Sequence, residues 1–206
     1  MQRRNWIKER TANTMSPRVN LDKEAILKIA ADIADRDGLE AVTIATLAKK
    51  LNIKSPSLYN HFDGMNDLRV HMAIYGMNEL YNSLINATIG VAGEEAIHCF
   101  AEAYITFARS HHGLYDAITQ ISLEKDERLQ VAGDKTVELV SRVLGTYKIN
   151  KEEEIHIVRG LRSMLHGFAS IEKNGGFGLP VDTDESLRNM VDIYLLGIQK
   201  YRNTEI

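Results

Sequence analysis

Apolar residues recur at helical spacing in the first third of the chain. A first helix is predicted between Leu21 and Gly38, on apolar positions at i, i+3, i+4 and i+7: Ile26, Ile29, Ala30 and Ile33. A short second helix, "IATLAKKL", follows Thr43, whose hydroxyl is placed to cap the first free backbone N–H groups. Asn52 ends it, since asparagine tolerates the left-handed conformation that a tight turn needs.

The next segment, "KSPSLYNHF" over residues 54–62, has one apolar and one polar face. Leu58 and Phe62 stand four residues apart, as on one buried helical face. Ser55 is a candidate cap, and proline suits a first helical turn, where its missing N–H is not needed. This spacing predicts a two-turn third helix. Lys54 and His61 fall at the edge of its buried face, and the outward positions are Pro56, Ser57, Tyr59 and Asn60.

Longer helical patterns fill the rest of the chain. The predicted helices cover, in order, about 65–88, 94–110, the short "GLYDAIT", 126–147, 151–173 and 183–202. Asn150 is the expected N-cap of the helix at 151, and residues 174–180, "NGGFGLP", are the clearest loop. With three prolines and no alternating Val/Ile/Thr-rich runs, the sequence predicts an all-α fold of about nine helices.

Charge divides unevenly along the 206 residues. Residues 1–62 carry 11 Lys and Arg against 7 Asp and Glu, whereas the whole chain has a net charge of −3. A basic first part joined to an acidic remainder indicates that only the first part faces a polyanion. Residues 1–20 are interpreted as a basic arm with Arg3, Arg4 and Arg10 as candidate minor-groove contacts. The alternative is a solvated tail, or a true start near Met15.

Other classes of chemistry find little support. Cys99 is the single cysteine, so no internal disulfide can form. No pair among Cys99 and the histidines has metal-ligand spacing, "GGFG" follows a helix rather than a strand, and no catalytic grouping is legible. We therefore expect no metal, no cofactor and no enzymatic activity. Without a long apolar run or a signal-peptide core, we also expect no membrane association and a cytoplasmic location.

Three short helices with a tight turn between the second and third form the plan of a helix-turn-helix module. Its third helix enters the major groove, where each base pair displays a distinct donor and acceptor pattern. The outward polar side chains are candidates for base and phosphate contacts, while lysines add attraction without sequence information. The predicted DNA-binding residues are Thr43, Lys54, Ser55, Pro56, Ser57, Tyr59, Asn60 and His61. For Tyr59 and His61 the alternative is a structural role at the edge of the core.

The segment "VTIATLAKKLNIKSPSLYNHFDGMNDL" resembles the DNA-binding segment of the tetracycline-repressor (TetR) family, whose hallmark is "LYxHF" close after the turn. The resemblance covers roughly Leu21 to Leu68. Residues 161–177 are similar to a C-terminal region of one branch, named for Trp, His and Gly positions. His166 and Gly167 fit that pattern, but Arg162 stands where tryptophan is expected. Many members also have lysine where this chain has Met65, and glycine at Asn52.

The resemblance implies a division into the arm at 1–20, a DNA-binding domain at 21–65, and a sensing and dimerisation domain at 66–206. It also implies a homodimer built by about 151–173 and 183–202, and therefore a near-palindromic double-stranded operator. A small-molecule effector would occupy a cavity among the middle helices. Its candidate residues are Tyr104, Phe107, Tyr115, Ile118, Leu161, Met164, Leu165, His166 and Phe168. Such residues also build ordinary bundle cores, so the alternative is a dimeric DNA-binding or protein-interaction module without an effector.

Overall fold

The computed structural model describes residues 22–122, 126–147 and 149–203, with side chains as far as residue 200. Within these ranges all regular structure is helical, which confirms the predicted all-α fold. The basic arm at 1–20 lies outside the described residues. The helices are α1 (Lys23–Asp37), η1 (Leu39–Ala41), α2 (Ile44–Leu51), η2 (Ser55–Asn60), α3 (Met65–Thr88), α4 (Gly93–Ser110), α5 (His112–Thr119), α6 (Glu127–Leu144), η4 (Gly145–Tyr147), α7 (Lys151–Lys173) and α8 (Thr183–Asn203).

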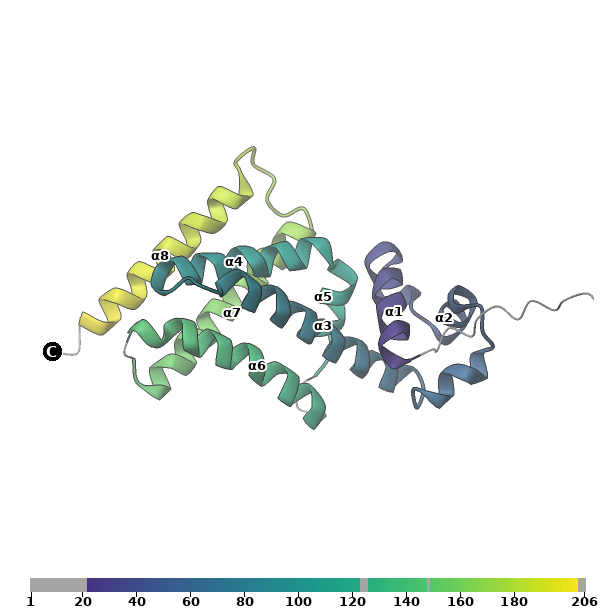
Figure 1. Ribbon diagram of the computed structural model, residues 1–206. Coiled ribbons are helices and arrows are strands. Elements are labelled where there is room, and N and C mark those ends of the chain that lie inside the picture. Colours follow the sequence, from purple (N-terminus) through teal and green to yellow (C-terminus); the bar gives the residue numbers. More distant parts are fainter. Residues whose placement is uncertain (1–21, 123–125, 148, 204–206) are drawn as a thin grey trace, which may run out of the picture.

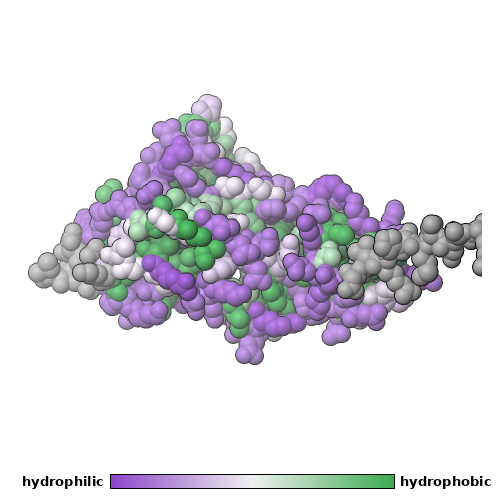
Figure 2. All heavy atoms as spheres, in the orientation of Figure 1, coloured by the Kyte–Doolittle hydropathy of each residue, from purple (hydrophilic) through white to green (hydrophobic). Residues whose placement is uncertain are grey.

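The molecule is elongated, with a small head at one end and a helical body at the other (Figure 1). The head contains α1, η1, α2 and η2, and the long α3 runs from it into the body. Within the body α3 packs against α4, α5 and α6, while α7 packs against α4, α6 and α8. The helix α8 lies at the end away from the head. Most of the surface on the face in Figure 2 is hydrophilic, and the largest group of hydrophobic residues on it lies on the body.

The head has its own apolar core. Leu58 and Phe62, the two positions predicted to face inward, are 0% and 1% exposed. Burying two such side chains contributes roughly 1.5–3 kcal/mol each, so they fix η2 to the head. The other members come from α1, α2, the start of α3, α5 and the link between η1 and α2: Ile26, Leu27, Ala30, Ile33, Ala34, Val42, Leu47, Ala48, Leu68, Met72 and Ala117.

Local caps explain where several helices begin and end. The predicted cap at Thr43 is confirmed, because its hydroxyl accepts from the Thr46 N–H at 3.1 Å, and the Thr43 N–H in turn donates to the Thr46 hydroxyl at 2.8 Å. Asn52 has a φ of 53°, which confirms the left-handed turn after α2. The Asn150 side chain accepts from the N–H groups of Glu152 and Glu153 at the start of α7, as predicted.

The third helix differs from its prediction. Residues Ser55–Asn60 form a 3₁₀ helix, not two α-helical turns. The Ser57 N–H donates to the Lys54 carbonyl and the His61 N–H to the Leu58 carbonyl, both at 2.9 Å, which is the i→i+3 pattern of a 3₁₀ helix. The expected cap at Ser55 is wrong, since Lys54 holds the N-cap position and no side chain caps the helix. Similarly, the helix predicted to reach 147 ends at Leu144 and tightens into η4.

One arginine joins three helices of the body. Arg109 of α4 donates to both carboxylate oxygens of Glu172 in α7, at 2.8 and 2.7 Å, and to Asp184 of α8 at 2.6 Å. These charge-assisted bonds lower the pKa of Glu172 below its ordinary value, against the opposing effect of partial burial. The Arg109 guanidinium therefore holds the end of α7 and the start of α8 against α4.

Head and body meet where the end of α1 contacts the start of α5. The Asp35 carboxylate accepts from the backbone N–H groups of Gly113 and Leu114, both at 2.9 Å, and contacts His111 Nδ1 at 2.9 Å. Asp35 thus caps α5 through Gly113, which follows it by 78 residues in the chain. The two backbones approach so closely that a Cβ at Gly113 would lie 2.1 Å from the Ala34 carbonyl.

We expect Gly113→Ala to lower the free energy of unfolding by about 3 kcal/mol or more, because its methyl group overlaps rigid backbone. Urea denaturation measures this change. Gly133→Ala in α6 is the matched control, since a Cβ there meets nothing within 4 Å. The control should be stabilised by up to about 1 kcal/mol through helix propensity. Equal stability of the two variants would contradict the tight contact between α1 and α5.

Candidate nucleic-acid interface and body cavity

The outer surface of the head carries most of the residues predicted to bind DNA. Lys54, Pro56, Tyr59 and Asn60 are exposed on or beside η2, and Tyr59 is 57% exposed. Ser55, Ser57 and His61 are only partly exposed. A short helix with exposed hydrogen-bonding groups and two buried anchors has the dimensions to enter a major groove.

Further polar groups surround this helix. Thr43 is exposed at the start of α2, although its hydroxyl is already engaged with Thr46. Lys49 and Lys50 are exposed in the last turn of α2. Three cations, counting Lys54, therefore lie within six residues of one another along the chain, which suits contact with a phosphate backbone.

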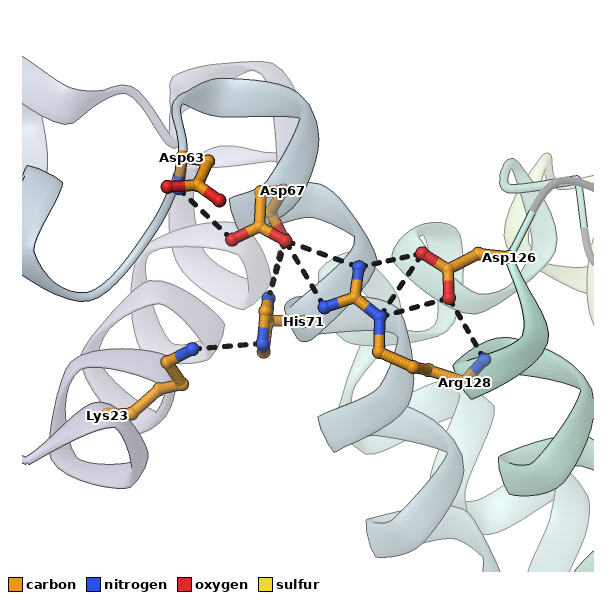
Figure 3. A network of polar contacts seen from close by, with 6 residues as sticks. All are labelled: Lys23, Asp63, Asp67, His71, Asp126 and Arg128. Atoms are coloured by element: carbon orange, nitrogen blue, oxygen red, sulfur yellow. Dashed lines mark hydrogen bonds and ion pairs between the residues drawn. The ribbon is translucent and has the colours of Figure 1, made fainter.

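A network of polar contacts ties the head to α6 (Figure 3). Asp67, in the first turn of α3, accepts from both terminal nitrogens of Arg128 at 3.3 Å and from the Asp63 N–H at 3.2 Å. Arg128 is held by Asp126 at the start of α6. On the other side of Asp67, His71 Nδ1 lies 3.3 Å from its carboxylate, and His71 Nε2 lies 3.1 Å from Lys23 Nζ of α1. The network therefore spans α1, α3 and α6.

The charge state of Asp67 depends on this network. Partial burial alone would raise its pKa, but the Asp63 N–H, His71 and Arg128 together lower the pKa below its ordinary value. The ionised carboxylate is thus the form that the folded state prefers. Sequence reasoning missed this contact, because Asp67 and Arg128 are 61 residues apart.

The body contains a cavity of about 380 Å³ bordered by five helices, α3 to α7. Its volume is within the range of small-molecule sites. The lining residues are Met77, Leu80, Phe100, Tyr104, Ile118, Thr119, Gly133, Thr136, Val137, Val140, Val158, Arg159, Leu161, Arg162, Ser163, Leu165 and His166.

Sequence reasoning found part of this lining. Five candidates border the cavity: Tyr104, Ile118, Leu161, Leu165 and His166. The other four lie elsewhere: Phe107 and Met164 border separate surface hollows, Phe168 packs on Phe177, and Tyr115 is buried beside Tyr104. The residues that it missed include all those from α3 and α6, and the basic pair on α7. For that pair a signal existed, since Arg159, Arg162, Ser163 and His166 follow the i, i+3, i+4, i+7 spacing of one helical face.

A chain of hydrogen bonds forms one polar part of the wall. The hydroxyl groups of Tyr104 and Tyr115 lie 3.0 Å apart, and the Tyr115 hydroxyl lies 2.8 Å from His166 Nδ1. Burial raises the pKa of both tyrosines, so each hydroxyl stays protonated and available as a donor. The bond from Tyr115 fixes the imidazole of His166 at the edge of the cavity.

Three other histidines have structural partners. His98 contacts Asp192 at 2.9 Å, His111 contacts Asp35, and His71 belongs to the network in Figure 3. Among the described residues, no three His, Cys, Asp or Glu side chains gather as a metal site would require. The described helices also include none that is long and apolar enough to cross a membrane.

Helices α7 and α8 expose apolar side chains on their outer surface. Ile193 and Leu196 of α8 are 71% and 64% exposed, and Ile155 of α7 is 43% exposed. The two helices pack closely at Gly160, where a Cβ would lie 2.6 Å from the Tyr194 hydroxyl. The helices α7 and α8 therefore form one closely packed unit whose outer surface carries exposed apolar side chains.

Comparison with known proteins places this geometry in a family. Residues 26–72 match the family described as bacterial regulatory proteins, tetR family, and residues 97–194 match a tetracyclin repressor-like C-terminal domain. The chain is 35% identical over 185 residues to YobS of Bacillus subtilis (strain 168), an uncharacterized HTH-type transcriptional regulator, covering 89% of this chain and 96% of that protein. The chain belongs to the TetR family of transcriptional regulators.

A second relative and several solved structures agree with the TetR assignment. An uncharacterized HTH-type transcriptional regulator of Mycobacterium tuberculosis is 32% identical over 87% of this chain and 83% of its own length. A protein of unknown function from Rhodococcus sp. RHA1 has the same fold, with a TM-score of 0.76 at 18% identity over 88% of this chain and 98% of that one. A TetR variant of Acinetobacter baumannii in complex with minocycline has a TM-score of 0.67 at 16% identity, over 88% and 98% of the two chains. Members of this family are DNA-binding transcriptional regulators, a class that is generally not enzymatic.

The Asp67 network predicts a pH-dependent contribution to stability in this TetR-family chain. Because the folded state lowers the pKa of Asp67, its contribution is present above the unfolded value of 3.8 and disappears as the pH falls through the lowered pKa. Asp67→Asn should therefore lower the free energy of unfolding near neutral pH by about 1 kcal/mol, and this difference should vanish in acid. Thermal denaturation across pH measures both effects.

Asp134→Asn serves as the control, because Asp134 is exposed on α6 and makes no ion pair among the described residues. It should change stability little at any pH. A difference for Asp67→Asn that persists unchanged in acid would show that the ion pair does not contribute.

Proposed function

We propose that this chain is a homodimeric, sequence-specific repressor that leaves a near-palindromic operator when a small molecule occupies the body cavity. The observation that carries the proposal is the exposed polar face of η2 above the buried Leu58 and Phe62, in a chain of the TetR family. Residues 21–65 bind DNA in this proposal, and 66–206 sense the effector and dimerise. Acting on DNA places the protein in the cytoplasm.

DNA recognition divides between two kinds of residue. Asn60 is exposed near the end of η2, and an asparagine amide can pair with two groups of an adenine edge. Lys54 precedes the helix and supplies charge for the phosphate backbone. Pro56, Ser57 and Tyr59 complete the contact surface, while Ser55, His61 and Thr43 support its edges.

Dimerisation rests on the outer surface of α7 and α8. Its exposed Ile155, Ile193 and Leu196 would be buried against the same residues of a second copy around a two-fold axis. A dimer also presents two η2 helices at once, which accounts for an operator with two similar half-sites.

Release requires that the effector bind one head arrangement better than another. The cavity helices also hold the head: α5 through Asp35, and α6 through Arg128. The fold neighbour from Acinetobacter baumannii, crystallised with minocycline, supports a small molecule as the effector.

Selection of bound sequences from a random DNA library tests the DNA-binding part. Asn60→Ala should relax the preference at one position of each half-site, costing about 1–3 kcal/mol of discrimination. Lys54→Ala should weaken binding to all sequences alike and reduce the salt slope by about one. Lys151→Ala, an exposed lysine in the body, is the control and should leave both quantities unchanged. Failure to enrich any sequence contradicts the proposal, and an unchanged preference removes Asn60 from the base contacts.

Sedimentation at micromolar concentration tests the dimer. The unchanged chain should sediment as a dimer, and Leu196→Glu should sediment as a monomer, because association would bury an unpaired charge. Val131→Glu is the control: Val131 is 57% exposed on α6, away from the proposed interface. A monomeric unchanged chain, or a dimer that tolerates Leu196→Glu, would rule out this interface.

A further inference from the structure

The ionisable side chains of Arg and His that border the body cavity are all basic. Arg159 and Arg162 of α7 are cations, His166 is the third titratable base, and no Asp or Glu belongs to the lining. The rest of the lining is mainly apolar, with Met77, Leu80 and other aliphatic groups contributed by the facing helices. We propose that the cavity binds an organic anion with an apolar body, and that Arg159 and Arg162 hold its carboxylate.

This inference rests on the proposed function, since it names the chemical class of the effector. It starts from the pairing of the arginines in the body. Arg109, Arg128 and Arg142 each form an ion pair with a carboxylate of the chain. Arg159, Arg162 and Arg188 are exposed and form none with any residue that the structure describes, and of these three only Arg159 and Arg162 border the cavity. Two cations one turn apart on a helix repel each other, and an anion between them removes that repulsion.

Arg159 and Arg162 both border the cavity because they lie on the same face of α7. Residues 159, 162, 163 and 166 follow one helical stripe, which adds the Ser163 hydroxyl and the His166 imidazole to the same wall. The charge of Arg162 also reaches the tyrosines: burial raises the pKa of Tyr104, and Arg162 acts in the opposite direction. Arg162 and His166 are also one turn apart on α7, and both border the same cavity as Tyr104.

The lining combines basic and apolar side chains, which favours an amphipathic ligand. An adjacent stripe of α7 contributes Val158, Leu161 and Leu165, and α4 and α6 contribute Phe100 and Val140. A guanidinium presents planar, paired donors that match the two oxygens of a carboxylate. A cationic ligand would meet two uncompensated positive charges and no carboxylate, so it is the class that this lining disfavours most.

Binding of matched compounds to the full-length protein tests the inference. Each set contains a carboxylate, the corresponding alcohol and the corresponding amine on one apolar body; decanoate, decanol and decylamine form one set, and 2-naphthoate with its alcohol and amine counterparts forms another. Calorimetry gives the affinities. In at least one set the carboxylate should bind at least about tenfold more tightly than its alcohol, the ratio expected for one charge-assisted hydrogen bond. The amine should bind most weakly.

Variants then locate the anion. Arg159→Gln and Arg162→Gln should each weaken carboxylate binding about tenfold and leave alcohol binding unchanged, whereas Arg162→Lys should retain part of the preference. Arg142→Gln is the control, because Arg142 is exposed on α6 and does not border the cavity. The inference is overturned if no carboxylate binds more tightly than its alcohol, including the case in which none binds, or if both glutamine variants retain the preference.

The outcome is separable from that of the proposed function. Binding of the unchanged chain to its selected DNA is measured without any ligand, and release is scored with each compound in turn. Release by neutral or amine compounds alone would preserve the repressor and remove the anion. Failure to bind any DNA, together with a carboxylate preference that depends on Arg159 and Arg162, would preserve the anion site and remove the repressor.

Discussion

The position of the head depends on one carboxylate at the end of α1. Asp35 satisfies two backbone N–H groups that the start of α5 cannot satisfy within its own helix, and Gly113 lets the two backbones meet. A buried donor without an acceptor costs about 1–3 kcal/mol, so separating α1 from α5 is penalised even where little apolar surface is lost. The same contact fixes where α3 crosses from head to body, because α3 packs on both α1 and α5.

The head is therefore held by helices that also border the cavity. On one side, α5 contributes Ile118 and Thr119 to the lining and is capped by Asp35. On the other, α6 contributes Thr136 and carries Arg128, whose partner Asp67 is in the first turn of α3. Under the proposed function, a ligand that shifts α5 or α6 slightly also shifts the contacts of Asp35 with α5 and of Asp67 with Arg128. Closely packed contacts of this kind switch between discrete arrangements instead of deforming gradually. The coupling needs no contact between ligand and DNA-binding residues.

Sequence reasoning succeeded where the cause of a structure is local. Helix positions followed from periodicity, and Thr43 and Asn52 were predictable because a cap and a left-handed turn depend on one or two residues. It failed at Ser55–Asn60, because the spacing of Leu58 and Phe62 predicts that both are buried but does not separate a short α-helix from a 3₁₀ helix. Contacts such as Asp35 with Gly113 were out of reach, since nothing in either segment marks the other as its partner.

The cavity illustrates the same limit differently. Apolar residues that border a cavity and those that fill a core are the same types, so periodicity found Leu161 and Leu165 but could not separate them from Phe168. Polar residues are more informative, because a charged side chain that borders a cavity can contact a ligand directly. On α7 the apolar stripe accounts for packing against α4, whereas the stripe through Arg159 and Arg162 is exposed and borders the cavity. A helix that carries a second, cationic stripe toward a cavity is better explained by what it binds than by what it supports.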